Sequence, residues 1–465
     1  MKWQRSALII TRSFPPDASV GVHRVLGLCR HLAESGRWRV TVITAAPPEG
    51  AAVDEGLLAA VPEKVRVVRT AAPDLPRLAA RVVKGRKRAK PSNDRGRPDA
   101  EPSETRAGAG PVLALPRRAL RYAVDWTSWW LHVPDGKTGW LLPAVWAGWR
   151  EARRERPDVI FTTAPVWTAH VAGAILSTML RVRLVADFRD PWVGSAFRNV
   201  PYAPHRWLSA WLERRVVARA AHVTCAWDGI RRHLATRYPR YADKVTTILN
   251  GYDPDALEAA PARRPDLPGR VFVHAGGFYG PRSPLPLLEA LRRLQAGGNG
   301  LAGKAAFLLA GPGEYKGRAL ADLAAEYGAA NLVHGHPRVP HREALGLIKG
   351  ADAAMLFGQS GSEALATIPA KAYEYIGLRK PVLAIGAGRE VCNVMRRGGC
   401  PVWSAPADDP AALAAAIDHV LRYLAGAEPP PEPVPEKPED LTRKRMAEEI
   451  EKVLGARCQK LGAGS

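Results

Sequence analysis

Short apolar runs alternate with helical segments along most of this chain, and this alternation constrains its fold more than any other feature. The first such unit joins an apolar run at 7–11, a helical pattern at 22–34 and a second apolar run at 39–44. A continuous apolar run is typical of a strand that is buried on both faces, as in parallel sheets. The strand–helix–strand order therefore predicts an α/β fold with parallel sheets.

The length of the chain predicts more than one domain, because 465 residues exceed what a single core normally holds. The pattern runs from the start to about residue 250 and begins again with an apolar run at 271–275. We predict one domain over 1–250, a second over 251–427, and a proline-rich linker with a final helix over 428–465. Within the first domain, 84–115 is predicted to be a disordered insertion, since basic, Pro and Gly residues dominate it.

The formal net charge of +22 favours an anionic partner: nucleic acid, acidic lipid or a phosphorylated ligand. An alternative explanation is a GC-rich genome, since Ala, Arg, Gly and Pro are all abundant. No nucleic-acid-binding motif accompanies the charge, so no nucleic-acid partner is expected. Five cysteines without C-x-x-C spacing indicate neither a disulfide framework nor a zinc site and fit a reducing cytoplasm.

The apolar runs are too short to cross a bilayer, and the N-terminus lacks the pattern of a signal peptide. We therefore expect a cytoplasmic protein, with peripheral attachment to the inner face of the plasma membrane left open. Basic residues precede Trp126, Trp129 and Trp130. This arrangement fits either an amphipathic segment on an anionic membrane or tryptophans that pack in the core or line an acceptor pocket.

A short helix is predicted at 369–377, beginning at Pro369 and ending at Gly377, and it carries Lys371 and Glu374. The N-terminus of a helix presents unpaired N–H groups and partial positive charge, which suit a diphosphate. A glutamate one turn further on is placed to accept both hydroxyls of a ribose. The alternative is a surface helix whose polar residues are merely solvated.

A glycine-rich loop follows the apolar run at 271–275 and contains Gly276, Gly277 and, slightly later, Arg282. Glycines let the backbone approach phosphate oxygens, and an arginine supplies the counter-charge. No metal site is expected. The sequence Asp253-Pro254-Asp255 predicts a helix N-cap rather than a metal-binding D-x-D motif, and His334 and His336 have no acidic companion.

The first domain also has polar residues where strands end, which is where parallel sheets bind ligands. Gly21 lies in the loop after the first strand, and Asp187, Arg189 and Asp190 follow the strand predicted at 183–186. Alternatively, Gly21 is an ordinary turn glycine and the charged residues pair with one another to hold the loop.

Taken in order along the chain, these motifs resemble the GT-B glycosyltransferases, specifically family 4. The resemblance rests on the Pro-Pro-Asp loop with Gly21, the segments 187–192, 250–253 and 310–313, and the stretch from Pro369 to Pro381. It covers most of the chain except 84–110 and the tail. It implies a GT-B fold, in which two Rossmann-like parallel-sheet domains face each other across a cleft.

The resemblance also implies roles for single residues. Glu374 resembles the second glutamate of the family's E-x7-E pattern, and Ala366 stands at the position of the first. The family's phosphate-binding Arg and Lys fall at Gly277 and Arg282, so Lys371 is the candidate replacement for the lost cation. Arg189 stands where many relatives have a histidine.

The implied activity is retaining transfer of a sugar, hexosyl or related, from a nucleoside diphosphate sugar to a glycan, lipid-linked or small-molecule acceptor in cell-surface polysaccharide or glycoconjugate biosynthesis. No cofactor is implied and a metal is not expected to be required. The predicted catalytic residues are Arg282, Lys371 and Asp190; the donor site adds Gly276, Gly277, Thr367, Ile368 and Glu374; the acceptor side comprises Gly21, His23, Trp140, Asp187, Arg189 and Asp190.

Two other classes of function stay open from the sequence. One is an epimerase of UDP-sugars on the same architecture, which would need no acceptor. The other is a non-catalytic subunit of a glycan assembly complex, which the alanine at position 366 suggests. The sequence does not indicate the donor sugar, its base, the acceptor or the oligomeric state.

Overall fold

The computed structural model describes residues 4–17, 19, 21–47, 53–77, 126, 129–195, 200–278, 282–297, 301, 303–311, 313–358 and 368–456. Contacts divide the chain into two compact units. The first comprises Met1–Val22, Gly36–Phe188 and Arg198–Val223, and the second comprises His23–Ser35, Arg189–Phe197 and Thr224–Ser465. The predicted insertion at 84–115 lies outside the described residues, and the predicted domain limits stay predictions.

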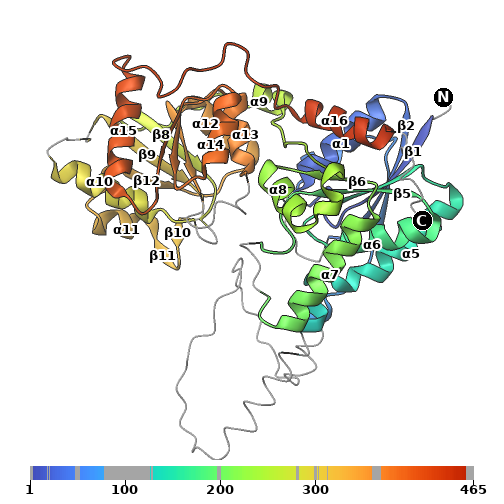
Figure 1. The fold of residues 1–465 in the computed structure, drawn as a ribbon. Helices are drawn as coiled ribbons and strands as arrows, with labels where there is room; N and C mark the ends of the chain where they lie inside the picture. The colour runs from blue at the N-terminus through green and yellow to red at the C-terminus, as the bar shows by residue number, and fades with distance from the viewer. Residues whose placement is uncertain are drawn as a thin grey trace, which may run out of the picture. The chain divides into compact units, whose positions relative to one another are not determined.

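The first sheet has seven strands in the order β3-β2-β1-β4-β5-β6-β7 (Figure 1). Its strands are β1 (Arg5–Ile10), β2 (Trp38–Ala45), β3 (Arg66–Thr70), β4 (Val159–Ala164), β5 (Arg183–Phe188), β6 (His222–Cys225) and β7 (Val245–Thr247). β1 pairs in parallel with both β2 and β4, β2 with β3, and β4 with β5. All six residues of β4 are buried, as expected for a strand covered on both faces.

The second sheet has six strands in the order β12-β9-β8-β13-β14-β15. They are β8 (Arg270–Ala275), β9 (Ala305–Ala310), β12 (Val333–His336), β13 (Ala353–Phe357), β14 (Val382–Ile385) and β15 (Val402–Ala405). Its pairs are parallel. Its core includes Phe272 and Phe307, whose rings stack with centroids 4.9 Å apart. A small antiparallel pair, β10 (Glu314–Tyr315) and β11 (Arg318–Ala319), stands apart from both sheets.

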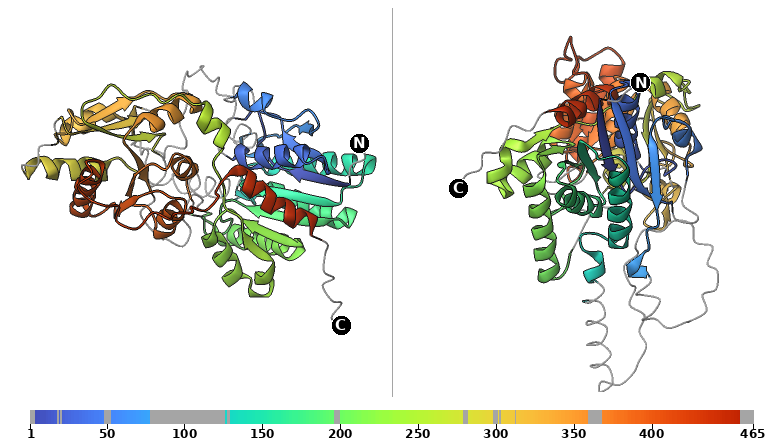
Figure 2. Two further views of the ribbon diagram at one scale, coloured as in Figure 1. Left: turned by 90° about the horizontal axis from the view of Figure 1, so that it is seen from above. Right: turned by 90° about the vertical axis from the view of Figure 1, so that its right-hand side faces the viewer.

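Helices pack on the faces of both sheets (Figures 1 and 2). The helices are α1 (Val22–Glu34), α2 (Glu55–Ala59), α5 (Leu141–Arg154), α6 (Thr168–Leu180), α7 (Ala203–Arg219), α8 (Asp228–Arg237), α9 (Pro254–Ala259), α10 (Leu285–Ala296), α11 (Leu320–Glu326), α12 (His341–Gly350), α13 (Ala370–Gly377), α14 (Arg389–Arg397), α15 (Pro410–Leu424) and α16 (Arg443–Gly455), with 3₁₀ turns η1 (Trp129–His132), η2 (Thr138–Trp140) and η3 (Pro239–Lys244). Two parallel-sheet α/β domains of this kind confirm the predicted fold class.

Helix α13 ends at Gly377, as predicted, but it begins one residue later than predicted. Pro369 is the N-cap, with extended backbone, and the helix begins at Ala370. Gly377 is the last helical residue, and the left-handed residue that follows the helix is Arg379, with φ of 48°. A Cβ at Gly377 would lie 2.3 Å from Cδ1 of Leu257, so close packing against α9 requires this glycine.

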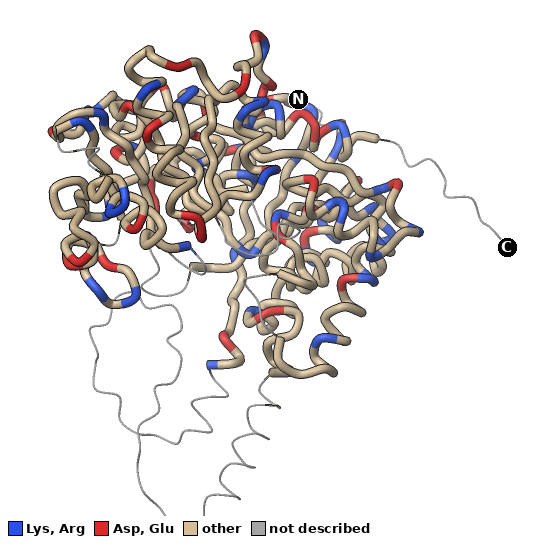
Figure 3. Tube along the Cα trace, turned by 60° about the vertical axis from the view of Figure 1, so that its left-hand side comes forward, with Lys and Arg blue, Asp and Glu red and all other residues tan. Residues whose placement is uncertain are grey.

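Charged residues of both signs occur along the described parts of the chain (Figure 3). Within the described ranges, no helix combines the length and the apolar character needed to cross a membrane.

Candidate active site

Gly276 and Lys371 meet at the carboxyl end of strand β8. Gly276 follows β8 directly, and its N–H donates a hydrogen bond to the carbonyl of Ala310 at the end of β9, at 2.6 Å. Its φ is 140°, a conformation that favours glycine. A Cβ at this position would lie 2.2 Å from Nζ of Lys371 and 2.6 Å from its Cε. The absence of a side chain at Gly276 therefore leaves the space that the lysine amine occupies.

Gly311 makes the same loop compact. A Cβ there would lie 2.5 Å from the carbonyl oxygen of Gly276. Gly277 follows Gly276 and is also among the described residues. The strand ends of β8 and β9 thus bring two glycine-containing segments into close backbone contact beside Lys371, an arrangement that suits a ligand held by backbone groups.

Two cationic side chains lie near each other in this region. Arg282 is only 6% exposed. The pKa of Lys371 is lowered to about 8, first by burial and then by the positive charge of Arg282, while Glu374 opposes the shift. Among the described residues no hydrogen bond or ion pair to the Lys371 ammonium occurs. Two positive charges held close together and partly shielded from water favour the binding of an anion beside them.

Glu374, one turn further along α13, is hydrogen-bonded to His341. The distance from Oε1 of Glu374 to Nε2 of His341 is 2.8 Å, and the carboxylate is 17% exposed. His341 is the first residue of α12, and sequence analysis missed it because the two residues are 33 positions apart and belong to no shared motif. The contact fixes the direction of the carboxylate that was predicted to bind ribose.

His274 is a second residue that sequence analysis missed, because it is placed inside the apolar run of β8. It is buried, its Nδ1 lies 3.1 Å from the carbonyl oxygen of Met355, and its ring stacks on Phe278. Burial, reinforced by the charges of Lys371 and Arg282, lowers the pKa of His274 well below its ordinary value. His274 is therefore neutral at physiological pH and adds no third positive charge.

The remaining predicted donor residues are at the start of α13. Ile368 is nearly buried and precedes the N-cap Pro369, which provides no side-chain hydrogen bond to the helix. The N–H of Ala372 donates to the carbonyl of Pro369 at 3.0 Å, and the earlier N–H groups, those of Ala370 and Lys371, lie where a helix N-terminus binds an anion. Thr367 and Ala366 lie outside the described residues.

The structure places the predicted acceptor-side residues in different surroundings. Trp140 is fully buried, and its indole N–H donates to Oγ1 of Thr70 at 2.8 Å. Asp187, also buried, accepts a hydrogen bond from the hydroxyl of Thr163 at 2.8 Å. Both side chains are held in the interior of the first unit, and Gly21 lies just before α1.

The other three acceptor-side residues fall in the second unit. The ring of His23 lies 5.9 Å from the ring of His341, and its pKa is lowered to about 4, chiefly by burial and next by the charge of Arg443. Burial raises the pKa of Asp190, and the positive charge of Arg189 opposes this rise. The roles of the acceptor-side residues stay predictions.

Asp253 is the N-cap of α9, as predicted. Its carboxylate accepts a hydrogen bond from the N–H of Ala256 at 3.4 Å and also pairs with Arg443 at 2.9 Å. In the part of the chain that the structure describes, no cluster of three His, Cys, Asp or Glu side chains is arranged to hold a metal ion.

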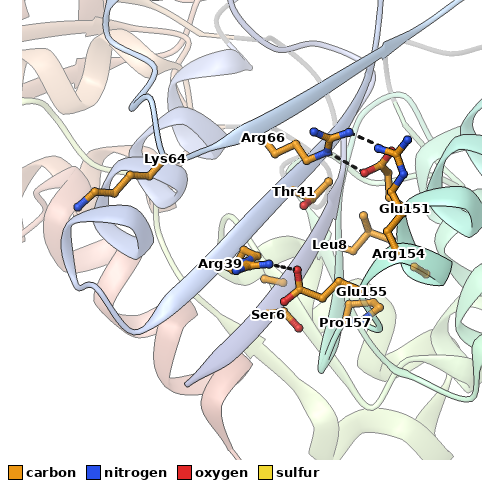
Figure 4. Close-up of a pocket in the computed structure, with 12 residues that line it drawn as sticks. Ser6, Leu8, Arg39, Thr41, Lys64, Arg66, Glu151, Arg154, Glu155 and Pro157 are labelled. Atoms are coloured by element: carbon orange, nitrogen blue, oxygen red, sulfur yellow. Dashed lines mark hydrogen bonds and ion pairs between the residues drawn. The ribbon is translucent and has the colours of Figure 1, made fainter. Parts of the chain in front are cut away.

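A separate cavity of about 470 Å³ opens at the amino ends of β1, β2 and β3 (Figure 4). Ion pairs line it: Arg39 with Glu155, and both Arg66 and Arg154 with Glu151. The cavity includes none of the predicted site residues. Ligands of parallel sheets bind at the opposite, carboxyl ends, so we interpret these ion pairs as structural.

Solved structures of other proteins share the architecture of this chain. A glycosyltransferase from Rickettsia africae aligns with a TM-score of 0.54 at 12% identity, covering 97% of this chain and 98% of the other. HepE of Anabaena in complex with UDP aligns with a TM-score of 0.54 at 14% identity, covering 97% of this chain and 99% of HepE. The UDP-forming trehalose-phosphate synthase of Burkholderia xenovorans aligns with a TM-score of 0.58 at 12% identity, covering 97% of this chain and 100% of the synthase. At these identities the likeness establishes the fold, which is GT-B.

Family models add the sequence relationship. Residues 112–256 match the model of Glycosyltransferase Family 4, and residues 269–423 match that of Glycosyl transferases group 1. The matches and the fold together identify the chain as a GT-B glycosyltransferase of the family 4 type. No curated protein matches its sequence significantly.

Proposed function

We propose that this glycosyltransferase uses a nucleoside diphosphate sugar and transfers the sugar with retention of configuration. The observation that carries the proposal is the position of the Lys371 amine against Gly276 with Arg282 nearby, since this arrangement presents two cations and backbone groups to one anion. Solved structures of HepE contain UDP and UDP-glucose, which supports a nucleotide-sugar donor for a chain of the same fold.

In the proposed reaction, the bond between the anomeric carbon and the diphosphate oxygen breaks, and a bond to the acceptor oxygen forms on the same face. The acceptor proton passes to the departing diphosphate, so no protein nucleophile is needed. Lys371, Arg282 and the N–H groups at the start of α13 stabilise the negative charge on the leaving group. Because these groups supply positive charge, we propose that no metal is required.

Glu374 is the proposed ribose ligand. Its hydrogen bond to His341 orients the carboxylate while part of it stays exposed to solvent. A carboxylate has enough acceptor positions to bind His341 and two ribose hydroxyls together.

For the acceptor we propose a glycan, lipid-linked or small molecule used in cell-surface polysaccharide or glycoconjugate synthesis. A cytoplasmic protein that works at the inner face of the plasma membrane would meet such acceptors. The net charge of +22 supports an anionic membrane as a further partner.

The donor site is tested by the thermal stabilisation of the full chain with UDP, GDP, ADP and TDP, without added metal. A nucleotide at 100 times its Kd is expected to add about 2.7 kcal/mol of stability. The Glu374→Ala variant is expected to lose most of this ligand-induced shift, measured against its own unliganded midpoint. The nucleotide that gives the largest shift identifies the base.

Glu343→Ala is the matched control, because Glu343 is a partly exposed glutamate on α12 that pairs with Arg263. It is expected to keep the full shift. If no nucleotide stabilises the wild type, or if Glu374→Ala responds like the wild type, the proposed donor site is wrong and a non-catalytic role becomes the better explanation.

A further inference from the structure

Three neighbouring helices of the first unit expose large apolar side chains to solvent. α5 packs against α6, and α6 packs against α7 (Figure 1). The most exposed apolar residues are Leu142 at 79%, Trp207 at 68% and Trp146 at 57%. We call this surface the tryptophan face, and it comprises Leu142, Trp146, Ile175, Met179, Trp207 and Trp211.

These side chains are not part of the core. On each helix they are spaced four residues apart and so share one side, as in the pair Trp207 and Trp211. Other residues of each helix are buried and make the packing, and on α5 most of them are small. A Cβ at Gly148 of α5, for example, would lie 2.5 Å from Cδ1 of Leu176 on α6. The apolar residues on the outer sides of the helices are therefore additional to those needed for folding, and such patches mark interaction surfaces.

The charged side chains that these helices expose are all positive. α5, α6 and α7 are described in full, and their only acidic residues, Glu151 and Glu213, are buried. α6 has no charged residue at all. The exposed and partly exposed charged side chains are Arg150, Arg153, Arg154, Arg206, Arg214, Arg215 and Arg219. Elsewhere along the described chain, charged residues of both signs occur (Figure 3).

Arginine and tryptophan side chains lie together on this face. The guanidinium of Arg150 lies 4.7 Å from the ring centroid of Trp146, and that of Arg215 lies 5.0 Å from Trp211. Trp and Arg have an apolar body and a polar end, and both are enriched where a membrane meets water. A basic, tryptophan-containing surface is what an anionic lipid headgroup layer attracts.

We propose that the tryptophan face is the surface by which this protein docks on an anionic lipid bilayer. The apolar side chains enter the interface, and the arginines contact the lipid phosphates. This inference rests on the anionic membrane partner in the proposed function and assigns the surface that contacts it. It does not depend on how the sugar donor is bound.

The tryptophans that the sequence suggested for this role lie beside the same helices. Trp126 and Trp130 pack against the buried ring of His205 in α7, with centroids 5.6 Å and 4.3 Å away, and Trp130 is 39% exposed. Trp129 instead packs against His132, with ring centroids 5.1 Å apart. Packing on α7 accounts for part of this cluster, and the exposed ring of Trp130 extends the apolar surface.

The test is flotation of the full chain with vesicles of phosphatidylcholine alone and with added phosphatidylglycerol. The wild type is expected to float only with the anionic vesicles and less so as salt rises. The double variant Trp207→Ser/Trp211→Ser is expected to bind at least about tenfold more weakly. Arg214→Gln/Arg215→Gln is expected to weaken binding and to reduce its dependence on salt.

The control is Leu58→Ser/Val434→Ser, which removes two exposed apolar residues outside the tryptophan face and should leave binding unchanged. Every variant is also tested for nucleotide-induced thermal stabilisation, which reports a folded donor site. Loss of vesicle binding with retained nucleotide response supports the docking surface.

The proposal is overturned if the wild type ignores anionic vesicles or if Trp207→Ser/Trp211→Ser binds them as well as the wild type does. It is also overturned if the double variant instead abolishes a concentration-dependent self-association of the wild type, because the face would then bind a second copy of the chain. If the protein does not bind vesicles but is still stabilised by a nucleotide, the docking surface is wrong and the proposed donor site stands. The two proposals can therefore be contradicted independently.

Discussion

Lys371→Met is expected to lower kcat by about a hundredfold or more, because it removes a cation placed against the departing diphosphate. Loss of one such electrostatic contact costs ~3–4 kcal/mol of barrier. The assay is release of nucleoside diphosphate from the sugar donor. Lys304→Met, at an exposed lysine of the same unit, is the matched control and should keep full activity. Unchanged turnover in Lys371→Met would show that the lysine does not act on the leaving group.

The pH profile gives this prediction a second readout. The pKa of Lys371 is about 8 because burial and Arg282 disfavour its charge, so the ammonium is present below that pH and is lost above it. Since kcat/KM reports groups of the free enzyme, it should fall as pH rises above about 8. Lys371→Arg keeps a charge at high pH and should lose this decline, even if its longer side chain lowers the rate. A wild-type profile that stays flat to pH 10 in these assays would contradict the assignment.

Gly276→Ala is expected to damage both stability and donor binding. The φ of 140° is strained for any other residue, at a cost of about 1–3 kcal/mol, and the new methyl group would overlap the Lys371 amine. Because that amine is the end of a flexible side chain, it can move away, so we expect the variant to fold with a lower Tm. The displaced amine should then raise the KM for the donor and lower kcat.

The control for this variant is Gly335→Ala on β12, where an added methyl group meets nothing within 4 Å and the φ is not positive. It should resemble the wild type in both Tm and kinetics. Wild-type donor kinetics in Gly276→Ala would mean that the position of the Lys371 amine does not matter for catalysis.

The sheets were predictable because buried parallel strands have a simple sequence signature. The run predicted at 39–44 is β2 (Trp38–Ala45), and the run at 271–275 is β8 (Arg270–Ala275). Strand β3 was missed, since arginines at 66 and 69 interrupt its apolar pattern at the edge of the sheet. Edge strands are partly exposed, so their sequences lack the continuous apolar run that marks central strands.

The candidate site was only partly predictable. Local motifs placed Lys371 and Glu374 on one helix and Gly276 after a strand, but the contact between Lys371 and Gly276 depends on how β8 and α13 meet. The pairing of Glu374 with His341 is equally a result of tertiary packing. The helix does end at Gly377, but its φ is not positive, and close packing rather than a left-handed backbone requires the glycine. A glycine required for packing looks the same in a sequence as a glycine required for its dihedral angles.

The most direct test of the donor site is hydrogen exchange of the full chain, with and without the nucleoside diphosphate that stabilises it most. We expect slower exchange at the amide of Gly277 and in the first turn of α13, whereas the amide of Gly276 is already hydrogen-bonded to the carbonyl of Ala310. Protection at the amino ends of β1, β2 and β3, around Arg39, Arg66 and Glu151, with no change at Gly277 or α13, would contradict the donor-site assignment.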